Sequence, residues 1–278
     1  MPRATTTASG IEIEYETFGD PAAPPLLLIA GLGAQMISWD EPFCTMLAGR
    51  GFHVIRFDNR DVGLSTWMDH AYTLEDMAGD AVALLDAIGI RSAHVVGVSM
   101  GGFIAQIVAL DHPDRVATLT LIMSGPNGDD QVPPTDEARV VLLAPDPGSI
   151  EQRIELGLWA KQKLVGPADP FDAPYERARI VRALQRAYHP AGFVRQLQAI
   201  AGASGRLERL RHLGVPALVI HGDADILVPV ENGRNLASAI PGARLVEIEG
   251  MGHDVPRRVW EQIADEIAAL ARQAATAC

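Results

Sequence analysis

A serine between two glycines is the most chemically informative feature of this sequence. Residues 97–101 read Gly-Val-Ser-Met-Gly, which matches the G-x-S-x-G pattern of a nucleophile elbow. In that pattern the serine lies at a sharp turn from a strand into a helix, where small flanking residues let neighbouring backbones come close. We therefore predict that Ser99 presents its hydroxyl beside a helix N-terminus, which favours developing negative charge. The alternative interpretation is an ordinary turn rich in glycine and serine.

A serine hydroxyl needs a histidine base to become a nucleophile, and the base needs an acid that fixes its tautomer. His253 is the candidate base, because it follows the Gly-Met-Gly run at 250–252. Asp223 and Asp225 are the candidate acids, and both follow an apolar stretch at 217–220. The chain order serine, aspartate, histidine differs from the orders in chymotrypsin and subtilisin.

The elements that must position these residues alternate between strand-like and helix-like segments. Short, largely apolar runs predict strands at 11–18, 25–30, 53–58, 93–96, 116–123, 217–222 and 243–249. Helical spacing follows a predicted cap at Thr73, and the last helix has a buried stripe of Trp260, Ile263, Ile267 and Leu270. Such alternation predicts an α/β fold with a mostly parallel, doubly wound sheet covered on both faces.

The alternation stops between residues 126 and 211, where prolines punctuate a helix-like and loop-like region. This stretch holds twelve Lys or Arg and eleven Asp or Glu, out of 23 and 35 in the whole chain, so the rest of the protein is strongly acidic. We predict a core of residues 1–125 and 212–278 and a helical lid of residues 126–211 over the carboxyl end of the sheet. Its basic cluster at Arg177, Arg179, Arg182 and Arg186 fits a solvated helix face or a site that attracts an acidic substrate.

Composition excludes several other classes of protein. A net charge of −12 argues against nucleic acid and anionic lipid as partners. The two cysteines, Cys44 and Cys278, are too few for a disulfide framework or a zinc site. No run reaches the roughly 18 apolar residues of a membrane span, and the first residues lack the apolar core of a secretory signal. These features predict a cytoplasmic protein.

Four motifs together resemble the α/β-hydrolase fold, and the resemblance spans the whole chain. They lie at residues 57–65, 97–102, 221–225 and 250–253. The sequence is most similar to bacterial serine esterases of the aclacinomycin methylesterase-like group. The resemblance implies a lid inserted after the sixth strand, and it implies that Asp225, three residues after the glycine that ends its strand, is the acid. A rarer arrangement would use Asp129 or Asp130.

The resemblance also implies an oxyanion hole, because acyl transfer needs donors for the developing oxyanion. These donors are the backbone N–H groups of Met100 and Leu32. The family usually has His-Gly before the second donor, whereas this chain has Ala30-Gly31, which leaves open how the loop around Leu32 is supported. We interpret the polar loop at 58–65 as a structural brace for the floor of the site.

Large side chains near these motifs are candidates for a substrate pocket, although core packing accounts for each of them equally well. They are Trp39, Met123 and Trp159, with Phe171, Tyr175, Tyr188 and Phe193 in the predicted lid.

We predict a serine hydrolase that needs no cofactor and no metal and cleaves a small-molecule carboxylic ester through an acyl-enzyme on Ser99. The alternatives are a polyketide-tailoring methylesterase, a lactonase or a perhydrolase with the same triad, or a slow-turnover ligand receptor. Dehalogenases and epoxide hydrolases of this fold have aspartate at the elbow, which argues against them. We expect a monomer or a small homo-oligomer.

Overall fold

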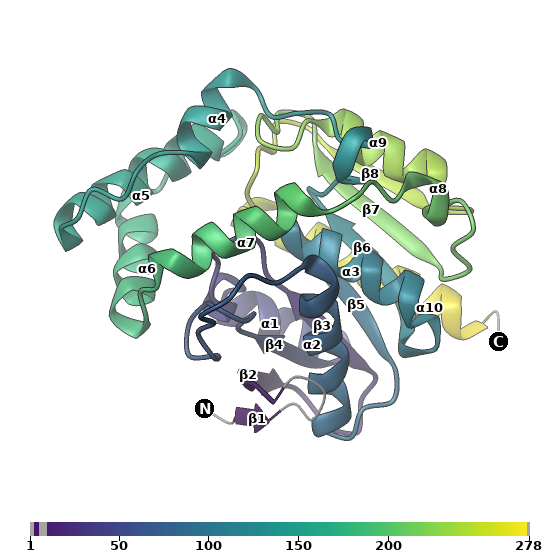
Figure 1. Cartoon of the computed structure of the whole chain (residues 1–278). Helices are drawn as coiled ribbons and strands as arrows, with labels where there is room; N and C mark the ends of the chain where they lie inside the picture. Colours follow the sequence, from purple (N-terminus) through teal and green to yellow (C-terminus); the bar gives the residue numbers. More distant parts are fainter. Residues whose placement is uncertain (1–2, 6–9, 277–278) are drawn as a thin grey trace.

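A computed structural model describes residues 3–5 and 10–276, and within them the chain forms one eight-stranded sheet (Figure 1). Its strands are β1 (Arg3–Thr5), β2 (Glu12–Phe18), β3 (Pro25–Ile29), β4 (His53–Phe57), β5 (Ala93–Val98), β6 (Val116–Ile122), β7 (Ala217–Gly222) and β8 (Arg244–Ile248). Their order is β1-β2-β4-β3-β5-β6-β7-β8. The six strands β3 to β8 pair in parallel with one another in the sheet. Strand β2 is antiparallel to both β1 and β4. The mostly parallel sheet of the predicted fold class is confirmed.

Helices cover both faces of this sheet and also fill the long connection from β6 to β7. They are α1 (Glu41–Gly49), α2 (Leu74–Ala87), α3 (Met100–Asp111), α4 (Asp136–Leu142), α5 (Ile150–Leu164), α6 (Ala173–Arg186), α7 (Pro190–Gly202), α8 (Leu207–Leu210), α9 (Val230–Ala239) and α10 (Trp260–Thr276). Short 3-10 turns lie at Met36–Ser38, Pro113–Arg115, Gly128–Asp130 and Arg257–Val259.

Two apolar cores lie on opposite faces of the sheet, because successive strand residues point to opposite sides. In β3, Leu27 and Ile29 join the core formed with α2 and α3. Leu26 and Leu28 join the core formed with α1 and α10. Every one of these four side chains is fully buried, which explains why the strand has no polar position.

The helix signals in the sequence correspond closely to the structure. Thr73 caps α2 in a capping box, in which its hydroxyl accepts from the Asp76 N–H and the Asp76 carboxylate accepts from the Thr73 N–H. The predicted stripe of α10 is buried in the core. Asp40 precedes α1, but its carboxylate accepts a hydrogen bond from the Tyr175 hydroxyl at 2.6 Å instead of capping that helix. The short strand β1 was not predicted.

Helices α4 to α7 lie at one end of the sheet, with α5 and α6 packed against each other and projecting from the body of the molecule (Figure 1). Helix α7 contacts α2, and α8 returns the chain to α3 and α9. No helix of the described residues combines the length and apolar character needed to cross a bilayer. Cys44 is a free, buried thiol, and Cys278 lies outside the described residues.

Candidate active site

Ser99 occupies the sharp turn between β5 and α3. Its backbone has φ 54° and ψ −120°, a conformation with positive φ that is strained for any residue with a side chain and is characteristic of functional positions. The turn is crowded, since a Cβ at Gly97 would overlap the backbone of residues 101 and 102, and one at Gly101 would overlap the carbonyl group of Ile29. The glycines of the motif are therefore required by packing, and they leave the Ser99 side chain partly exposed.

His253 and Asp225 extend from Ser99 in one hydrogen-bonded line. The Ser99 Oγ lies 3.1 Å from the His253 Nε2, and the His253 Nδ1 lies 2.7 Å from the Asp225 Oδ2. An ionised carboxylate can only accept hydrogen bonds, so the histidine proton belongs on Nδ1. The Nε2 lone pair is then free to accept the proton of the serine hydroxyl.

Backbone and side-chain donors hold the Asp225 carboxylate in its ionised form. Its Oδ1 accepts from the N–H groups of Leu227 at 2.9 Å and Val228 at 2.8 Å. Burial would raise the pKa of this carboxyl, but the neighbouring His253 and His221 hold the pKa below its usual value. The group is therefore a permanent acceptor for the Nδ1 proton at neutral pH.

The other carboxylates considered from the sequence have different surroundings. Asp223 accepts from the Gly250 N–H at 2.6 Å and so ties the turn after β7 to the loop that carries His253. Asp129 and Asp130 are exposed in the 3-10 turn after β6.

The two predicted oxyanion donors belong to the residue that follows Ser99 and to the loop after β3. Met100 is the first residue of α3, where backbone N–H groups have no partner within the helix. Gly31 lies against the serine, since a Cβ at this position would be 3.4 Å from the Ser99 Cβ, and Leu32 follows it. In the part of the chain that the structure describes, no hydrogen bond occupies the N–H of Leu32 or of Met100.

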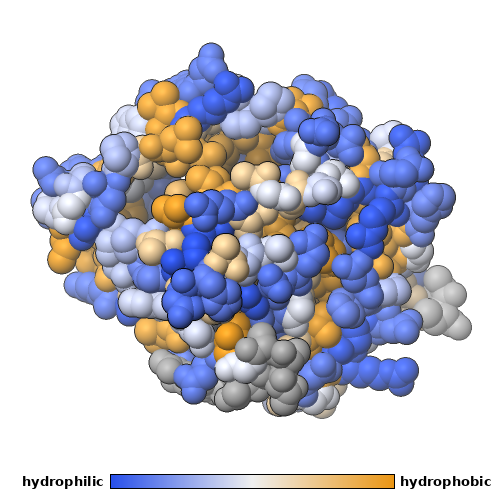
Figure 2. Space-filling view, viewed as in Figure 1, coloured by the Kyte–Doolittle hydropathy of each residue, from blue (hydrophilic) through white to orange (hydrophobic). Residues whose placement is uncertain are grey.

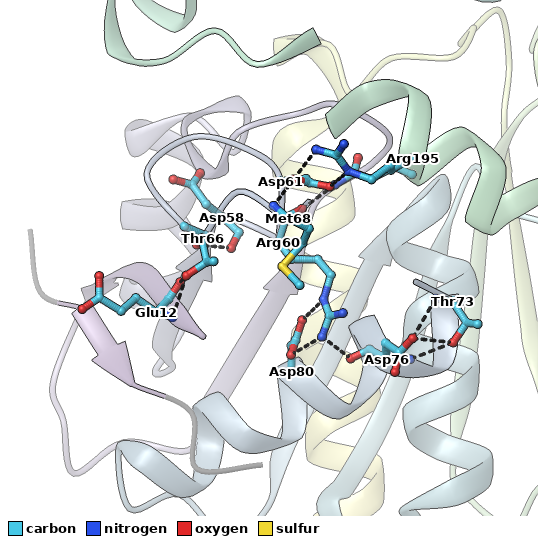
Figure 3. Close-up of polar contacts among 12 residues, drawn as sticks. Glu12, Asp58, Arg60, Asp61, Thr66, Met68, Thr73, Asp76, Asp80 and Arg195 are labelled. Atoms are coloured by element: carbon cyan, nitrogen blue, oxygen red, sulfur yellow. Dashed lines mark hydrogen bonds and ion pairs between the residues drawn. The ribbon is translucent and has the colours of Figure 1, made fainter. Parts of the chain in front are cut away.

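The polar loop after β4 is held by two ion pairs, of which the Arg60–Asp80 pair is buried (Figure 3). Arg60 binds Asp80 of α2 through two hydrogen bonds of 2.5 and 2.7 Å, and both side chains are buried. Asp61 binds Arg195 of α7 in the same two-pronged way, at 2.7 and 3.0 Å. Thr66 bonds to the backbone of Glu12, so the loop joins β2, α2 and α7.

Helix α5 ends against the loop that carries His253, a contact that the sequence did not indicate. The His253 N–H donates to the Leu164 carbonyl at 2.8 Å. Lys161 of the same helix pairs with Asp254 at 3.1 Å, next to the histidine in the chain. A Cβ at Gly166 would overlap the Gly250 carbonyl, so the two segments touch backbone to backbone.

The basic cluster of α6 is only partly a solvated face, and for Arg179 and Arg186 that interpretation is wrong. Arg186 reaches inward to the fully buried Asp58 at 2.7 Å, and Arg179 pairs with Glu176. Burial raises the pKa of Asp58, while Arg186 opposes that rise. These guanidinium groups are neutralised by carboxylates of the protein itself.

A cavity of about 630 Å³ lies among α4 to α7 and borders the loop after β3 at Gly33. Its walls are mostly apolar and include Leu156, Leu184, Tyr188, Phe193, Val194 and Leu197. Figure 2 shows apolar surface gathered over these inserted helices in the upper left of the view. Tyr188 and Phe193 were candidates from the sequence.

The other candidate pocket residues lie elsewhere. Trp39 is buried in the core and stacks on Phe43, and Met123 is buried at the end of β6. Trp159 lines a more open cavity between α4 and α5. Across residues 3–5 and 10–276, no three His, Cys, Asp or Glu side chains gather in a way that would hold a metal ion.

Comparison with known proteins agrees with this geometry. The family model of the alpha/beta hydrolase fold matches residues 24–256. Rhodomycin D methylesterase DauP of Streptomyces sp. (strain C5) is 36% identical, and DnrP of Streptomyces peucetius is 35% identical, each over 99% of both chains. The enol-lactonase from Burkholderia xenovorans LB400 superposes with a TM-score of 0.77 at 27% identity, over 99% of this chain and all of that one.

Proposed function

The chain belongs to the α/β hydrolase family, and on that premise we propose that it hydrolyses carboxylic esters with Ser99 as nucleophile, His253 as base and Asp225 as acid. The observation that carries this proposal is the unbroken hydrogen-bonded line from the Ser99 Oγ through His253 to a buried carboxylate. A strained serine with an adjacent, oriented imidazole is the arrangement that makes a hydroxyl nucleophilic.

The reaction proceeds in two halves. The Ser99 Oγ forms a bond to the ester carbonyl carbon while its proton moves to the His253 Nε2, and the N–H groups of Leu32 and Met100 stabilise the oxyanion. The C–O bond to the alcohol then breaks, and His253 returns the proton to the leaving oxygen. A water molecule, deprotonated by the same histidine, attacks the acyl-enzyme and releases the acid and the free serine.

The test is covalent labelling followed by kinetics. A fluorophosphonate should add once to the protein, and peptide mapping should place the adduct on Ser99. Ser99→Ala should abolish labelling and lower the turnover of p-nitrophenyl esters by up to about 10⁶-fold, the loss found for a comparable serine triad. Labelling of a different residue, or wild-type turnover by the variant, would overturn the assignment.

A second, narrower function is a methylesterase that tailors a polyketide. Both rhodomycin D methylesterases match the chain over nearly its whole length. The apolar cavity beside Gly33 has the volume of a typical small-molecule site, and a methyl ester of a large acid needs space on its acyl side only. We propose that this cavity holds the bulky apolar acid while methanol leaves.

A pair of substrates separates the two functions. The narrower function predicts faster hydrolysis of methyl anthraquinone-2-carboxylate than of methyl acetate, and selective loss of the former in Leu197→Trp, which fills the cavity. Val140→Trp, at a position 63% exposed on α4, is the matched control and should change neither rate. Equal rates with both substrates would favour a general esterase, and labelling without turnover would favour a ligand receptor.

We also propose that residues 126–211 form a lid over the site. Support comes from α5, whose end contacts His253, and from α7, which is bound to the loop after β4. The cytoplasmic location and the monomeric or small homo-oligomeric state stay predictions from the sequence.

A further inference from the structure

The side chains of the loop that carries the Leu32 N–H cannot fix its shape. Residues 30–34 read Ala-Gly-Leu-Gly-Ala, so no side chain of the loop can form a hydrogen bond. Gly33 has φ +65°, and each glycine allows many backbone conformations. An oxyanion donor is effective only when it is oriented before the reaction. One hydrogen bond within the loop, from the Ala34 N–H to the Gly31 carbonyl at 3.2 Å, helps to hold it, and the remaining constraints must come from other elements.

Gln196 of α7 supplies a hydrogen bond at the critical position. Its Oε1 accepts from the Gly33 N–H at 2.8 Å, and its Nε2 donates to the Arg60 carbonyl at 2.9 Å. The side chain is fully buried, so water does not compete for either bond. The amide thus bridges the loop after β3 to the loop after β4.

The peptide that Gln196 holds is adjacent to the peptide that contains the Leu32 N–H. Because peptide groups are planar, only the two dihedral angles of Leu32 separate the two planes. On the other side, Asn59 donates to the Ala30 carbonyl at 3.2 Å. The Ala34 N–H donates at 3.2 Å to the Gly31 carbonyl, which belongs to the same peptide as the Leu32 N–H. With its own carbonyl and both neighbouring peptides held, the Gly31–Leu32 peptide cannot rotate without breaking one of these bonds.

The anchor for Gln196 is itself rigid. Arg60, whose carbonyl accepts from the Gln196 amide, is tied to α2 through Asp80 (Figure 3). The neighbouring Arg195 binds Asp61 of the same loop. A Cβ at Gly33 would lie 2.8 Å from the Phe193 ring, so α7 also contacts the loop directly.

We propose that Gln196 is a positioning residue for the oxyanion hole, through which the inserted helix α7 controls the rate of the chemical step. This inference rests on the proposed function, because it assumes that the Leu32 N–H stabilises the oxyanion. It assigns to the inserted segment a role in turnover in addition to any role in holding the substrate.

The test replaces Gln196 with methionine, which has a similar shape but no hydrogen-bonding groups. Gln196→Met should lower kcat for p-nitrophenyl acetate by about 10- to 100-fold, less than the 10²- to 10³-fold loss of a whole oxyanion donor. The KM should stay within about three-fold, since only the transition state uses the donor. Affinity for a trifluoromethyl ketone, whose adduct with Ser99 mimics the tetrahedral intermediate, should fall by the same factor as kcat/KM.

Ala199→Gly is the matched control, because it loosens the same helix at a buried position without touching the loop. It should leave kcat and the ketone affinity within about three-fold of wild type. If Gln196→Met does not fold, Gln196→Leu removes both hydrogen bonds with a shorter apolar side chain, and it should show the same pattern of losses.

An unchanged kcat in Gln196→Met, or an equal loss in Ala199→Gly, would overturn the inference. The proposed function is judged separately, by labelling of wild-type Ser99. If the wild-type serine is labelled and turns over esters while Gln196→Met remains as active, then only the role of Gln196 is refuted.

Discussion

Replacing Asp225 with asparagine tests the direction of every hydrogen bond in the proposed triad. The carboxylate has two distinct sides, since Oδ1 accepts from the Leu227 and Val228 N–H groups while Oδ2 accepts from the His253 Nδ1. An asparagine has one oxygen and one NH₂ group. Turning the oxygen toward the histidine would set the NH₂ group against two backbone N–H groups, so the oxygen should face the backbone.

The NH₂ group of Asp225→Asn must then donate to the His253 Nδ1, which moves the histidine proton to Nε2. In that tautomer the nitrogen 3.1 Å from the Ser99 Oγ already carries a proton and cannot accept the serine's. The equivalent substitution in a trypsin-like triad lowers kcat by about 10⁴-fold, or about 5.5 kcal/mol of transition-state stabilisation. Because the donors around Asp225 impose the same change of tautomer on His253, we expect Asp225→Asn to lower kcat by about this factor.

The assay is steady-state hydrolysis of p-nitrophenyl acetate near pH 8, with thermal unfolding to show that the variant is folded. Asp223→Asn is the matched control, because an asparagine oxygen can still accept from the Gly250 N–H, and kcat should stay within about three-fold. If Asp225→Asn retained more than a tenth of wild-type kcat, the assignment of the acid and the reasoning about the tautomer would both be refuted.

Further predictions concern packing and buried charge. Arg186→Met should lower the free energy of unfolding by about 3 kcal/mol at pH 8, because it leaves the buried Asp58 carboxylate with two backbone N–H donors but no countercharge. Burial holds the pKa of Asp58 above its usual value, so this loss should shrink as the pH falls and the carboxyl takes up a proton in the folded variant; a gap in urea titrations that stays constant between pH 8 and pH 4 would contradict it. Burial also raises the pKa of the Cys44 thiol to about 12, so iodoacetamide at pH 8 should alkylate its peptide only after unfolding, as mass spectrometry would show. Gly101→Ala should lower the free energy of unfolding by about 1–3 kcal/mol and slow fluorophosphonate labelling, because a Cβ there overlaps the end of β3. Gly79→Ala is the control, because the space around Gly79 is open, and it should not lower the midpoint of thermal unfolding.

Local chemistry in the sequence was sufficient to predict the fold class and to nominate the reactive side chains. The alternation of apolar strands and capped helices specified a parallel sheet, because burial on both faces demands that pattern. Ser99 and His253 stand in glycine-rich turns directly after strands, and in a parallel sheet such turns meet at one edge. Asp223 and Asp225 were separable by family resemblance, and the structure places Asp225 against His253.

The supports of the site could not be read from the sequence. Gln196 lies 163 positions from Gly33, and a single glutamine on a helix has no periodic or motif signal that names its partner. The sequence likewise carried no signal for the hydrogen bond from the His253 N–H to the Leu164 carbonyl or for the ion pair between Arg186 and Asp58. Arg186 is regularly spaced with other arginines, a pattern that is typical of a solvated helix face.

The sequence by itself therefore determined the strands, the elbow and the reactive groups, because strain, turns and burial on both faces are imposed by residue types close together in the chain. Only the tertiary structure decided how the inserted helices hold the Leu32 loop and His253. Those contacts depend on the path of the chain between β6 and β7, and a hydrogen bond between distant residues exists only once that path brings a donor within about 3 Å of its acceptor.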